Sequence, residues 1–191
     1  EPFGRICSLS PVPIVADIHF DYRLAIAAVE HGASKLRINP GNIGSWDRVD
    51  AVIDAAGQAG AAIRIGVNAG SLDKDIASRE DLSQVDKLVA SSMQFVEHFE
   101  TRGFTDIVLS AKAHSVSTTL ETYRRLSSEL PQIPLHLGVT EAGGIQQGTI
   151  KSSIALGALL AEGIGDTMRV SLTADPVEEV PVAWGILSAL E

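Results

Sequence analysis

The stretch AIRIGVN at residues 62–68 decides the fold class of this chain. In it, the apolar residues Ile63, Ile65 and Val67 alternate with polar or small residues, beginning at Arg64. The same alternation recurs in short runs at residues 13–19, 35–39, 105–110, 134–140 and 167–172. Because strand side chains alternate with a period of two, the polar members share one face. Central strands of an open sheet are apolar on both faces, so the pattern favours an α/β fold of the TIM-type barrel class, with polar side chains inside.

A longer segment with helical spacing follows each predicted strand, which requires a parallel sheet covered by helices. We expect helices between Asp21 and Gly32 and at residues 46–59, 82–101, 117–130 and 147–162. A last helix is expected after Asp175-Pro176, where it forms a single turn and restarts at Pro181. In the first helix, Leu24, Ala28 and Val29 form the inward stripe. Residues 69–81, rich in Gly, Ser, Asp and Lys, are expected to be a functional loop.

The number of units indicates an incomplete barrel. A complete barrel has eight βα units in about 250 residues, whereas six units fill these 191 residues. Residues 1–191 are therefore expected to be one partial barrel domain. We expect the first two units to precede Glu1, because residues 1–12 are too few to supply them. Both ends are expected to be cut from a longer protein.

Composition excludes several classes of function. The formal net charge of −9 argues against nucleic-acid binding, which usually needs a basic surface. The longest apolar stretch, Ile154 to Ala161, is far shorter than the roughly 20 residues that cross a membrane. The single cysteine, Cys7, forms neither an internal disulfide nor a metal-thiolate cluster, and this chain is expected to supply no metal ligands. A reducing cytoplasm fits these features best.

The polar faces carry an excess of positive charge, although the chain is acidic overall. Arg37, Arg64, Lys112 and Arg169 share the inward parity, while Asp17 and Glu141 are the obvious acids there. Cations cannot share a partly desolvated pocket without an anion, and arginine forks match phosphate oxygens. We therefore predict a site for a phosphorylated, doubly charged substrate. Further candidates are Asn39, Asn68, Thr140 and Ser171 for hydrogen bonding, Glu141 as an acid or base, and Asp17 with His19 for a polyol or a proton relay.

Other interpretations stay open at this point. A single strand arginine is usually part of a structural ion pair, and a strand histidine such as His136 is more often a core residue than a catalyst. Lys112 could be a Schiff-base nucleophile, as in a phosphate-binding lyase or aldolase. A barrel that binds phosphate without catalysis is the third possibility. Repetition on several strands favours the anion site over isolated ion pairs.

Five ordered motifs resemble a known enzyme family. They are VADIHFDYRLA from Val15, LRINPGNIG from Leu36, IRIGVNAGSL from Ile63, PLHLGVTEAGG from Pro134 and GIGDTMRVSLTADPVEEV from Gly163. Together they resemble the 4-hydroxy-3-methylbut-2-enyl diphosphate synthases, the iron-sulfur oxidoreductases of the methylerythritol phosphate route to isoprenoids. The likeness runs from about Val12 to the end of the chain.

The resemblance implies a reaction and a set of roles. The family opens methylerythritol cyclodiphosphate reductively, with loss of water and uptake of two electrons from ferredoxin or flavodoxin. By motif match, Arg37, Arg64, Lys112 and Arg169 would bind the diphosphate, although the segment AKAHSV around Lys112 fits only loosely. The match places Asn39, Asn68 and Ser171 around the substrate, Asp17 and His19 along the pocket wall, and Glu141 beside the reacting carbon.

The resemblance also implies parts that this chain does not contain. In the family, a separate C-terminal domain carries a [4Fe-4S] cluster on three cysteines and a glutamate, and the enzyme is a homodimer. One cysteine cannot hold such a cluster, so the ligands are expected outside residues 1–191 and the isolated chain is expected to be inactive.

Overall fold

The computed structural model describes residues 2–72 and 74–191. Its strands are β1 (Val15–Ile18), β2 (Lys35–Ile38), β3 (Ala62–Asn68), β4 (Ile107–Lys112), β5 (His136–Gly138) and β6 (Thr167–Arg169). Strands β1 to β4 form one parallel sheet in sequence order, and β5 and β6 form a second parallel pair. A single bridge, Leu109 to Leu135, joins β4 to β5. Six strands therefore follow one another in chain order within the described residues, as the sequence predicted.

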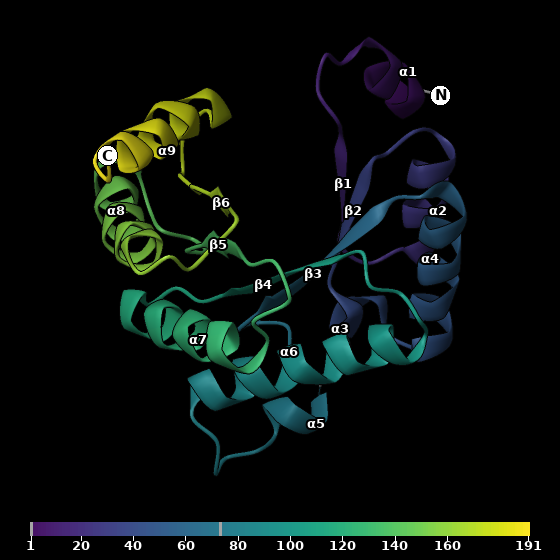
Figure 1. The fold of residues 1–191 in the computed structure, drawn as a ribbon, viewed down its shortest axis with the longest axis horizontal. Coiled ribbons are helices and arrows are strands. Elements are labelled where there is room, and N and C mark those ends of the chain that lie inside the picture. The colour runs from purple at the N-terminus through teal and green to yellow at the C-terminus, as the bar shows by residue number, and fades with distance from the viewer. Residues whose placement is uncertain (1, 73) are drawn as a thin grey trace.

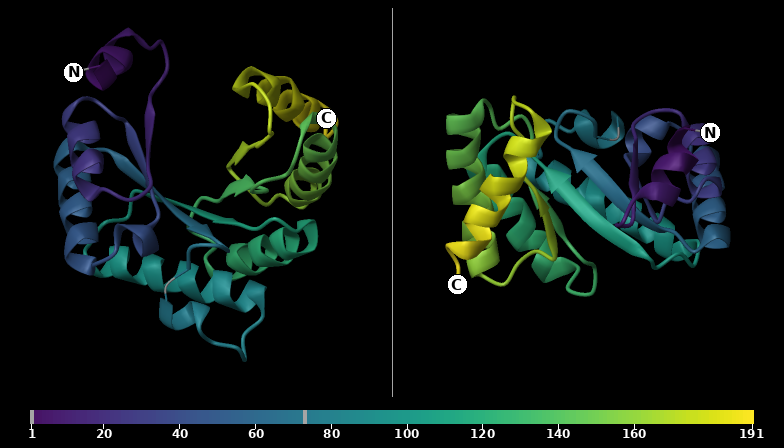
Figure 2. Two further views of the ribbon diagram at one scale, coloured as in Figure 1. Left: turned by 180° about the vertical axis from the view of Figure 1, so that it is seen from behind. Right: turned by 90° about the horizontal axis from the view of Figure 1, so that it is seen from above.

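The helices lie outside this curved sheet (Figure 1). They are α1 (Pro2–Leu9), α2 (Tyr22–Glu30), α3 (Pro40–Ile43), α4 (Trp46–Ala59), α5 (Lys74–Ala77), α6 (Gln84–Thr101), α7 (Val116–Glu129), α8 (Ile145–Ala161) and α9 (Glu179–Ser188), with a 3₁₀ turn at Pro176–Glu178. The ring of elements is open between β1 and β6, and both views in Figure 2 show the two ends of the chain on either side of the opening. The prediction of an incomplete α/β barrel is confirmed.

The apolar faces of the strands form the core against the helices. Leu36, Ile38, Ile63 and Ile65 are fully buried, and helix side chains such as Phe99 pack against the same core. The side chains of opposite parity are left to point into the barrel. The alternation in the sequence therefore separates the structural face of each strand from the face that can bind a ligand.

Three local predictions need correction. Leu24 does not belong to the inward stripe of α2, because it is 58% exposed beside the open edge at β1, whereas Ala28 and Val29 are buried. The loop at residues 69–81 contains the short helix α5, and Asp73 lies outside the described residues. The predicted single turn and restarted helix are both present, but α9 restarts at Glu179 and not at Pro181, which lies in its first turn, where the missing N–H is not needed.

The strand register places polar residues side by side. Asp17 on β1 pairs with Arg37 on β2, and Arg37 pairs with Arg64 on β3. Nearer the carboxyl ends of the strands, Asn68 pairs with Lys112. Neighbouring parallel strands are about 4.8 Å apart, so side chains of one face at paired positions are within reach of each other.

Candidate functional site

A small cavity lies at the carboxyl ends of the strands, and each of the six strands or the residues just after it contributes to its wall. The cavity has a volume of about 130 Å³ and is lined by Asp17, His19, Arg37, Arg64, Asn68, Lys112, Thr140 and Arg169. All eight are residues that the sequence predicted as site residues. Four are basic and one is a carboxylate, so the convergence predicted from strand parity is present in the fold.

Arg37 is the most deeply held of the basic residues, with its side chain 10% exposed. Its Nη1 donates to Oδ1 of Asp17 at 3.1 Å and lies 3.5 Å from Nδ1 of His19. With the Asn68 amide oriented so that both its polar atoms are satisfied, its oxygen accepts from Nη2 of Arg37 at 3.1 Å. A β-carbon at Gly66 would lie 2.9 Å from Nη2. The bare backbone of Gly66 therefore makes the space that the guanidinium occupies.

Arg64 is held by a histidine instead of a carboxylate. Its Nη1 lies 3.1 Å from Nε2 of His136, and Nδ1 of His136 lies 2.8 Å from Oγ1 of Thr167. Burial, reinforced by Lys112 and Arg64, lowers the pKa of His136 to about 2, so the imidazole is neutral. Burial also lowers the pKa of Arg64, with the charge of Arg37 acting in the same direction.

Lys112 reaches from β4 across to β5. A β-carbon at Gly138 would lie 2.8 Å from Cε of Lys112, so this glycine also makes room for a basic side chain. Burial, together with the charges of Arg64 and Arg169, lowers the pKa of Lys112 to about 7, and Asp17 partly opposes the shift. The amine is therefore close to half protonated near neutral pH in the absence of a bound anion.

Tyr123 of α7 joins the two sheets where their ladder is interrupted. Its hydroxyl donates to the carbonyl of His136 at 2.6 Å and accepts from the amide of Ala111 at 3.2 Å. The ring is fully buried, and burial raises the pKa of the phenol to about 12, so the hydroxyl keeps its proton. Tyr123 therefore links the backbones of β4 and β5, beside the direct hydrogen bond from the amide of Leu109 to the carbonyl of Pro134.

Three predicted site residues do not line the cavity. Asn39 is fully buried, where it accepts from the amide of Gly41 and donates to Oγ of Ser71 at 2.6 Å, so it caps α3 and holds the loop after β3. Ser171 is half-buried beyond the end of β6. Glu141 follows the cavity residue Thr140, but its side chain is 80% exposed, 3.4 Å from Nδ1 of His114.

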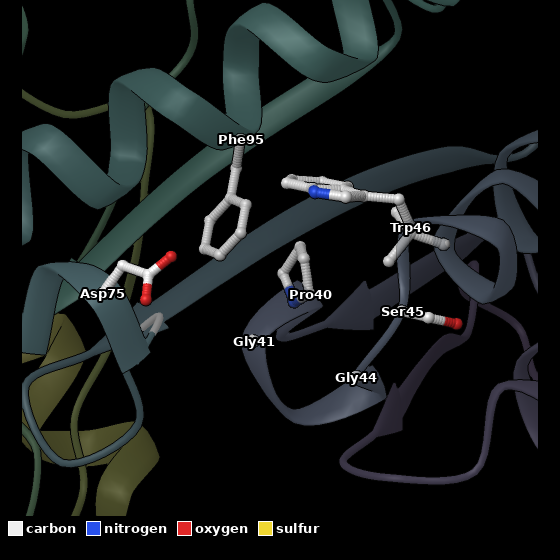
Figure 3. Close-up of a pocket in the computed structure, with 8 residues that line it drawn as sticks. Pro40, Gly41, Gly44, Ser45, Trp46, Asp75 and Phe95 are labelled. Carbon is white, nitrogen blue, oxygen red and sulfur yellow. The ribbon is translucent and has the colours of Figure 1, made fainter.

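A second hollow of about 420 Å³ is lined, among the described residues, by none of the predicted site residues. Figure 3 shows Trp46 and Phe95 facing it, with Pro40 between them. The Trp46 ring also stacks on His98, with their centroids 3.9 Å apart. None of the described residues that line this hollow is basic, in contrast to the barrel cavity with its four basic side chains.

The sequence matches a known family along nearly its whole length. A model described as the GcpE TIM-barrel domain covers residues 1–184. This chain belongs to the GcpE TIM-barrel family. The family match confirms both the predicted resemblance and the TIM-type fold.

Two curated relatives of this GcpE chain have the same enzymatic name. The chain is 56% identical over 190 residues to the 4-hydroxy-3-methylbut-2-en-1-yl diphosphate synthase (flavodoxin) of Pseudomonas fluorescens SBW25. It is 55% identical to the protein of the same name from Pseudomonas putida GB-1. Each match covers 100% of this chain and 51% of the relative, so the chain spans about half the length of the curated relatives it matches.

Solved structures with little sequence similarity have the same fold. The dihydropteroate synthase of Yersinia pestis, solved with a sulfonamide drug complex, superposes with a TM-score of 0.63 at 14% identity over 98% of this chain and 70% of that one. The 7,8-dihydropteroate synthase of Vibrio fischeri superposes with a TM-score of 0.54 at 12% identity, over 98% and 69% of the two chains. At such low identity the likeness shows the fold alone.

The residues of this GcpE chain do not fit an iron-sulfur cluster. Cys7, its one cysteine, lies in α1 against Gly32, at the end of α2. In residues 2–72 and 74–191, no group of three His, Cys, Asp or Glu side chains could hold a metal ion. The same described residues include no helix that is long and apolar enough to cross a membrane.

Sequence reasoning missed four residues that shape the site of this GcpE chain. Gly66 and Gly138 have the inward parity, and a glycine at such a position is a signal for a close approach of another side chain. His136 is buried, as a strand histidine of the core would be, but it also contacts Arg64. Tyr123 gave no sequence signal, because a tyrosine on the buried face of a helix is usually only a packing residue.

Proposed function

We propose that this chain is the diphosphate-binding barrel of a 4-hydroxy-3-methylbut-2-enyl diphosphate synthase, and that the cavity binds methylerythritol cyclodiphosphate. One observation carries the proposal: among the described residues, four basic side chains and one carboxylate line one small cavity. The four basic side chains repel one another in this partly buried space, and Asp17 offsets only part of the repulsion. A bound diphosphate would offset the rest. The name shared by the relatives supplies the substrate class.

Each side chain has a role in this proposal that follows from its chemistry. Arg37, Arg64, Lys112 and Arg169 bind the diphosphate oxygens, and the amide of Asn68 and hydroxyl of Thr140 orient the substrate from the cavity wall. Asp17 and His19 hold Arg37 and line the pocket. Asn39 acts through the loop at Ser71, and Ser171 extends the site beyond β6.

Glu141 is the proposed proton donor or polar stabiliser beside the reacting carbon. It follows Thr140 directly, and its φ of 49° is a conformation that residues with a side chain seldom adopt. Such local strain is often found at functional sites. In this proposal the exposed carboxylate leaves its contact with His114 and turns toward a substrate seated in the cavity.

The complete reaction needs parts that this chain does not provide. Reductive ring opening takes up two electrons and two protons and releases one oxygen of the substrate as water. A [4Fe-4S] cluster would pass on those electrons singly, and we propose that a domain outside residues 1–191 holds it. We further propose two more βα units before residue 1, flavodoxin or ferredoxin as the donor, a homodimer, and the cytoplasm as the compartment. The name of the relatives supports flavodoxin.

The proposal is tested by binding and by activity. Calorimetry is expected to show that the wild-type protein binds methylerythritol cyclodiphosphate. The affinity is expected to fall about 10- to 100-fold in Arg64→Gln and in Arg169→Gln, because each variant loses hydrogen bonds between charged groups. Arg124→Gln is the matched control, because Arg124 pairs with Glu162 on the surface. Equal affinity in all variants would contradict the proposed site.

Activity must be measured on the protein expressed from its complete gene, under anaerobic conditions with reduced flavodoxin. The expected product is the hydroxymethylbutenyl diphosphate. Binding without any turnover in that protein would leave only a non-catalytic phosphate-binding barrel.

A second candidate reaction rests on the lowered pKa of Lys112. An amine with a pKa of about 7 is partly unprotonated at neutral pH, which is what a Schiff-base nucleophile needs. The chain would then be a lyase or aldolase acting on a phosphorylated carbonyl compound. Borohydride reduction in the presence of such compounds would trap an adduct on Lys112, and the absence of an adduct would favour the reductase.

A further inference from the structure

His136 has contacts on three sides, although its parity alone gave it no role in binding. It is 5% exposed on β5, its Nε2 faces Nη1 of Arg64 at 3.1 Å, and its Nδ1 faces Oγ1 of Thr167 at 2.8 Å. Its carbonyl accepts from the hydroxyl of Tyr123 at 2.6 Å. The backbone and the ring of His136 are therefore both held in place, and the ring in turn holds a cavity arginine.

We propose that His136 is a positioning residue that aims Arg64 at the bound anion through a neutral acceptor, leaving the charge of the guanidinium for the ligand. The proposal rests on the anion site proposed above and deepens it. It assigns to His136 no contact with the substrate, since the ring does not line the cavity.

Hydrogen-bond donors and acceptors define the tautomer of the ring. A guanidinium can only donate, so Nε2 of His136 must accept from Arg64 and carries no proton. The remaining proton is then on Nδ1, where it is donated to the hydroxyl oxygen of Thr167 on the neighbouring strand. A second proton on the ring would leave an N–H pointing at the guanidinium. The basic neighbours Lys112, Arg169 and Lys35 oppose that charge as well.

Arg37 shows the alternative way to hold an arginine. Its partner is the carboxylate of Asp17, which cancels part of its charge. A carboxylate at His136 would do the same to Arg64 and lower the net positive charge around the cavity by one unit, so that an anion would be attracted less strongly. A neutral imidazole accepts the same hydrogen bond without reducing the net positive charge of the cavity.

The first test measures the ring directly. We expect NMR of the protein labelled with ¹⁵N-histidine to show His136 neutral, with its proton on Nδ1, from about pH 5 to pH 9. Four other histidines provide reference signals within the same sample. A protonated ring in this range, or a proton on Nε2, would overturn the proposal without any substitution.

The second test compares substitutions at residue 136 by calorimetry with inorganic pyrophosphate at several salt concentrations. His136→Gln, which offers an amide oxygen in the place of Nε2, is expected to bind within about threefold of wild type. His136→Leu is expected to bind about tenfold more weakly. His136→Glu is expected to bind more weakly still and with a shallower salt dependence, because it adds one negative charge beside Arg64. His98→Gln is the control, since His98 pairs with Asp50 on the helical layer.

A double-mutant cycle separates this role from a general loss of structure. In an Arg64→Gln background, His136→Leu is expected to cause no further loss of affinity. If Arg64→Gln weakens binding but His136→Leu does not, the inference on His136 is wrong and the anion site stands. If Arg64→Gln itself has no effect, the proposed site fails. Should His136→Leu not fold, Thr167→Val, which removes only the partner of Nδ1, is expected to weaken binding by about threefold, and an unchanged affinity would count against the proposal.

Discussion

Replacing Gly66 with alanine tests whether a bare backbone position creates the anion site. The new methyl group would lie 2.9 Å from Nη2 of Arg37 and closer still to its Nε. Comfortable contact needs about 3.5 Å, so the guanidinium must move by about 0.6 Å or more. Its bonds to Asp17 and Asn68, both 3.1 Å long, would then exceed the limit for a hydrogen bond.

The expected cost follows from those two bonds. A hydrogen bond to a charged group contributes about 1.5 to 3 kcal/mol, and overpacking a core costs about 1 to 3 kcal/mol. Because part of Arg37 can rehydrate after it moves, we expect the free energy of unfolding to fall by about 2 kcal/mol. Withdrawing one of four basic groups from the cavity is expected to weaken pyrophosphate binding about 10- to 100-fold.

Calorimetry with pyrophosphate and denaturation in urea measure the two effects of Gly66→Ala on one sample. Gly157→Ala in α8 is the matched control, because an added methyl group there meets no atom within 4 Å. The control is expected to keep wild-type affinity and to gain up to about 1 kcal/mol of stability from better helix propensity. Wild-type affinity in Gly66→Ala would refute the idea that the space above Gly66 positions Arg37.

Three further results are expected. The protein should take up close to one proton when it binds pyrophosphate at pH 8, because the bound anion raises the pKa of Lys112 from about 7. Calorimetry in buffers of different ionisation enthalpy measures this proton uptake. The same uptake in Lys112→Met would show that the proton does not go to Lys112. Tyr123→Phe should lower the free energy of unfolding by about 1 to 3 kcal/mol, because the amide of Ala111 and the carbonyl of His136 lose their partner. Tyr22→Phe is the control and should have little effect. Equal urea midpoints for Tyr123→Phe and the wild-type protein would disprove the bridge. Asp17→Asn should lower the free energy of unfolding of the ligand-free protein by about 1 to 3 kcal/mol, because it breaks the ion pair with Arg37. Saturating pyrophosphate should then raise the melting temperature of this variant more than that of the wild-type protein. An equal rise in both proteins would argue against an ion pair that competes with the ligand for Arg37.

Strand parity predicted the part of the site that depends on the backbone alone. The inward positions on successive strands needed no knowledge of contacts, and Arg37, Arg64 and Arg169 all line one cavity. The same reasoning failed for Asn39, whose inward parity is overruled by local hydrogen bonds that use its amide to cap α3. A polar side chain next to a turn has competing partners, and the pattern of the strand does not rank them.

The opening between β1 and β6 explains another difference. Asp17 and Arg169 have the same parity as their buried counterparts, yet the side chain of Asp17 is 41% exposed and Arg169 is exposed as well. Both lie on strands that have a ladder partner on one side only. Burial depends on which elements cover a strand, and that is a property of the assembled barrel.

The amino-acid sequence by itself determined the barrel, the orientation of its polar side chains and the excess of positive charge among them, because a strand has a period of two regardless of what surrounds it. Only the tertiary structure decided how each basic group is held: Arg37 above Gly66 with Asp17, and Arg64 against the neutral ring of His136. Those contacts join residues on different strands. Their lengths depend on the spacing and curvature of the sheet, which arise from packing and not from any local pattern.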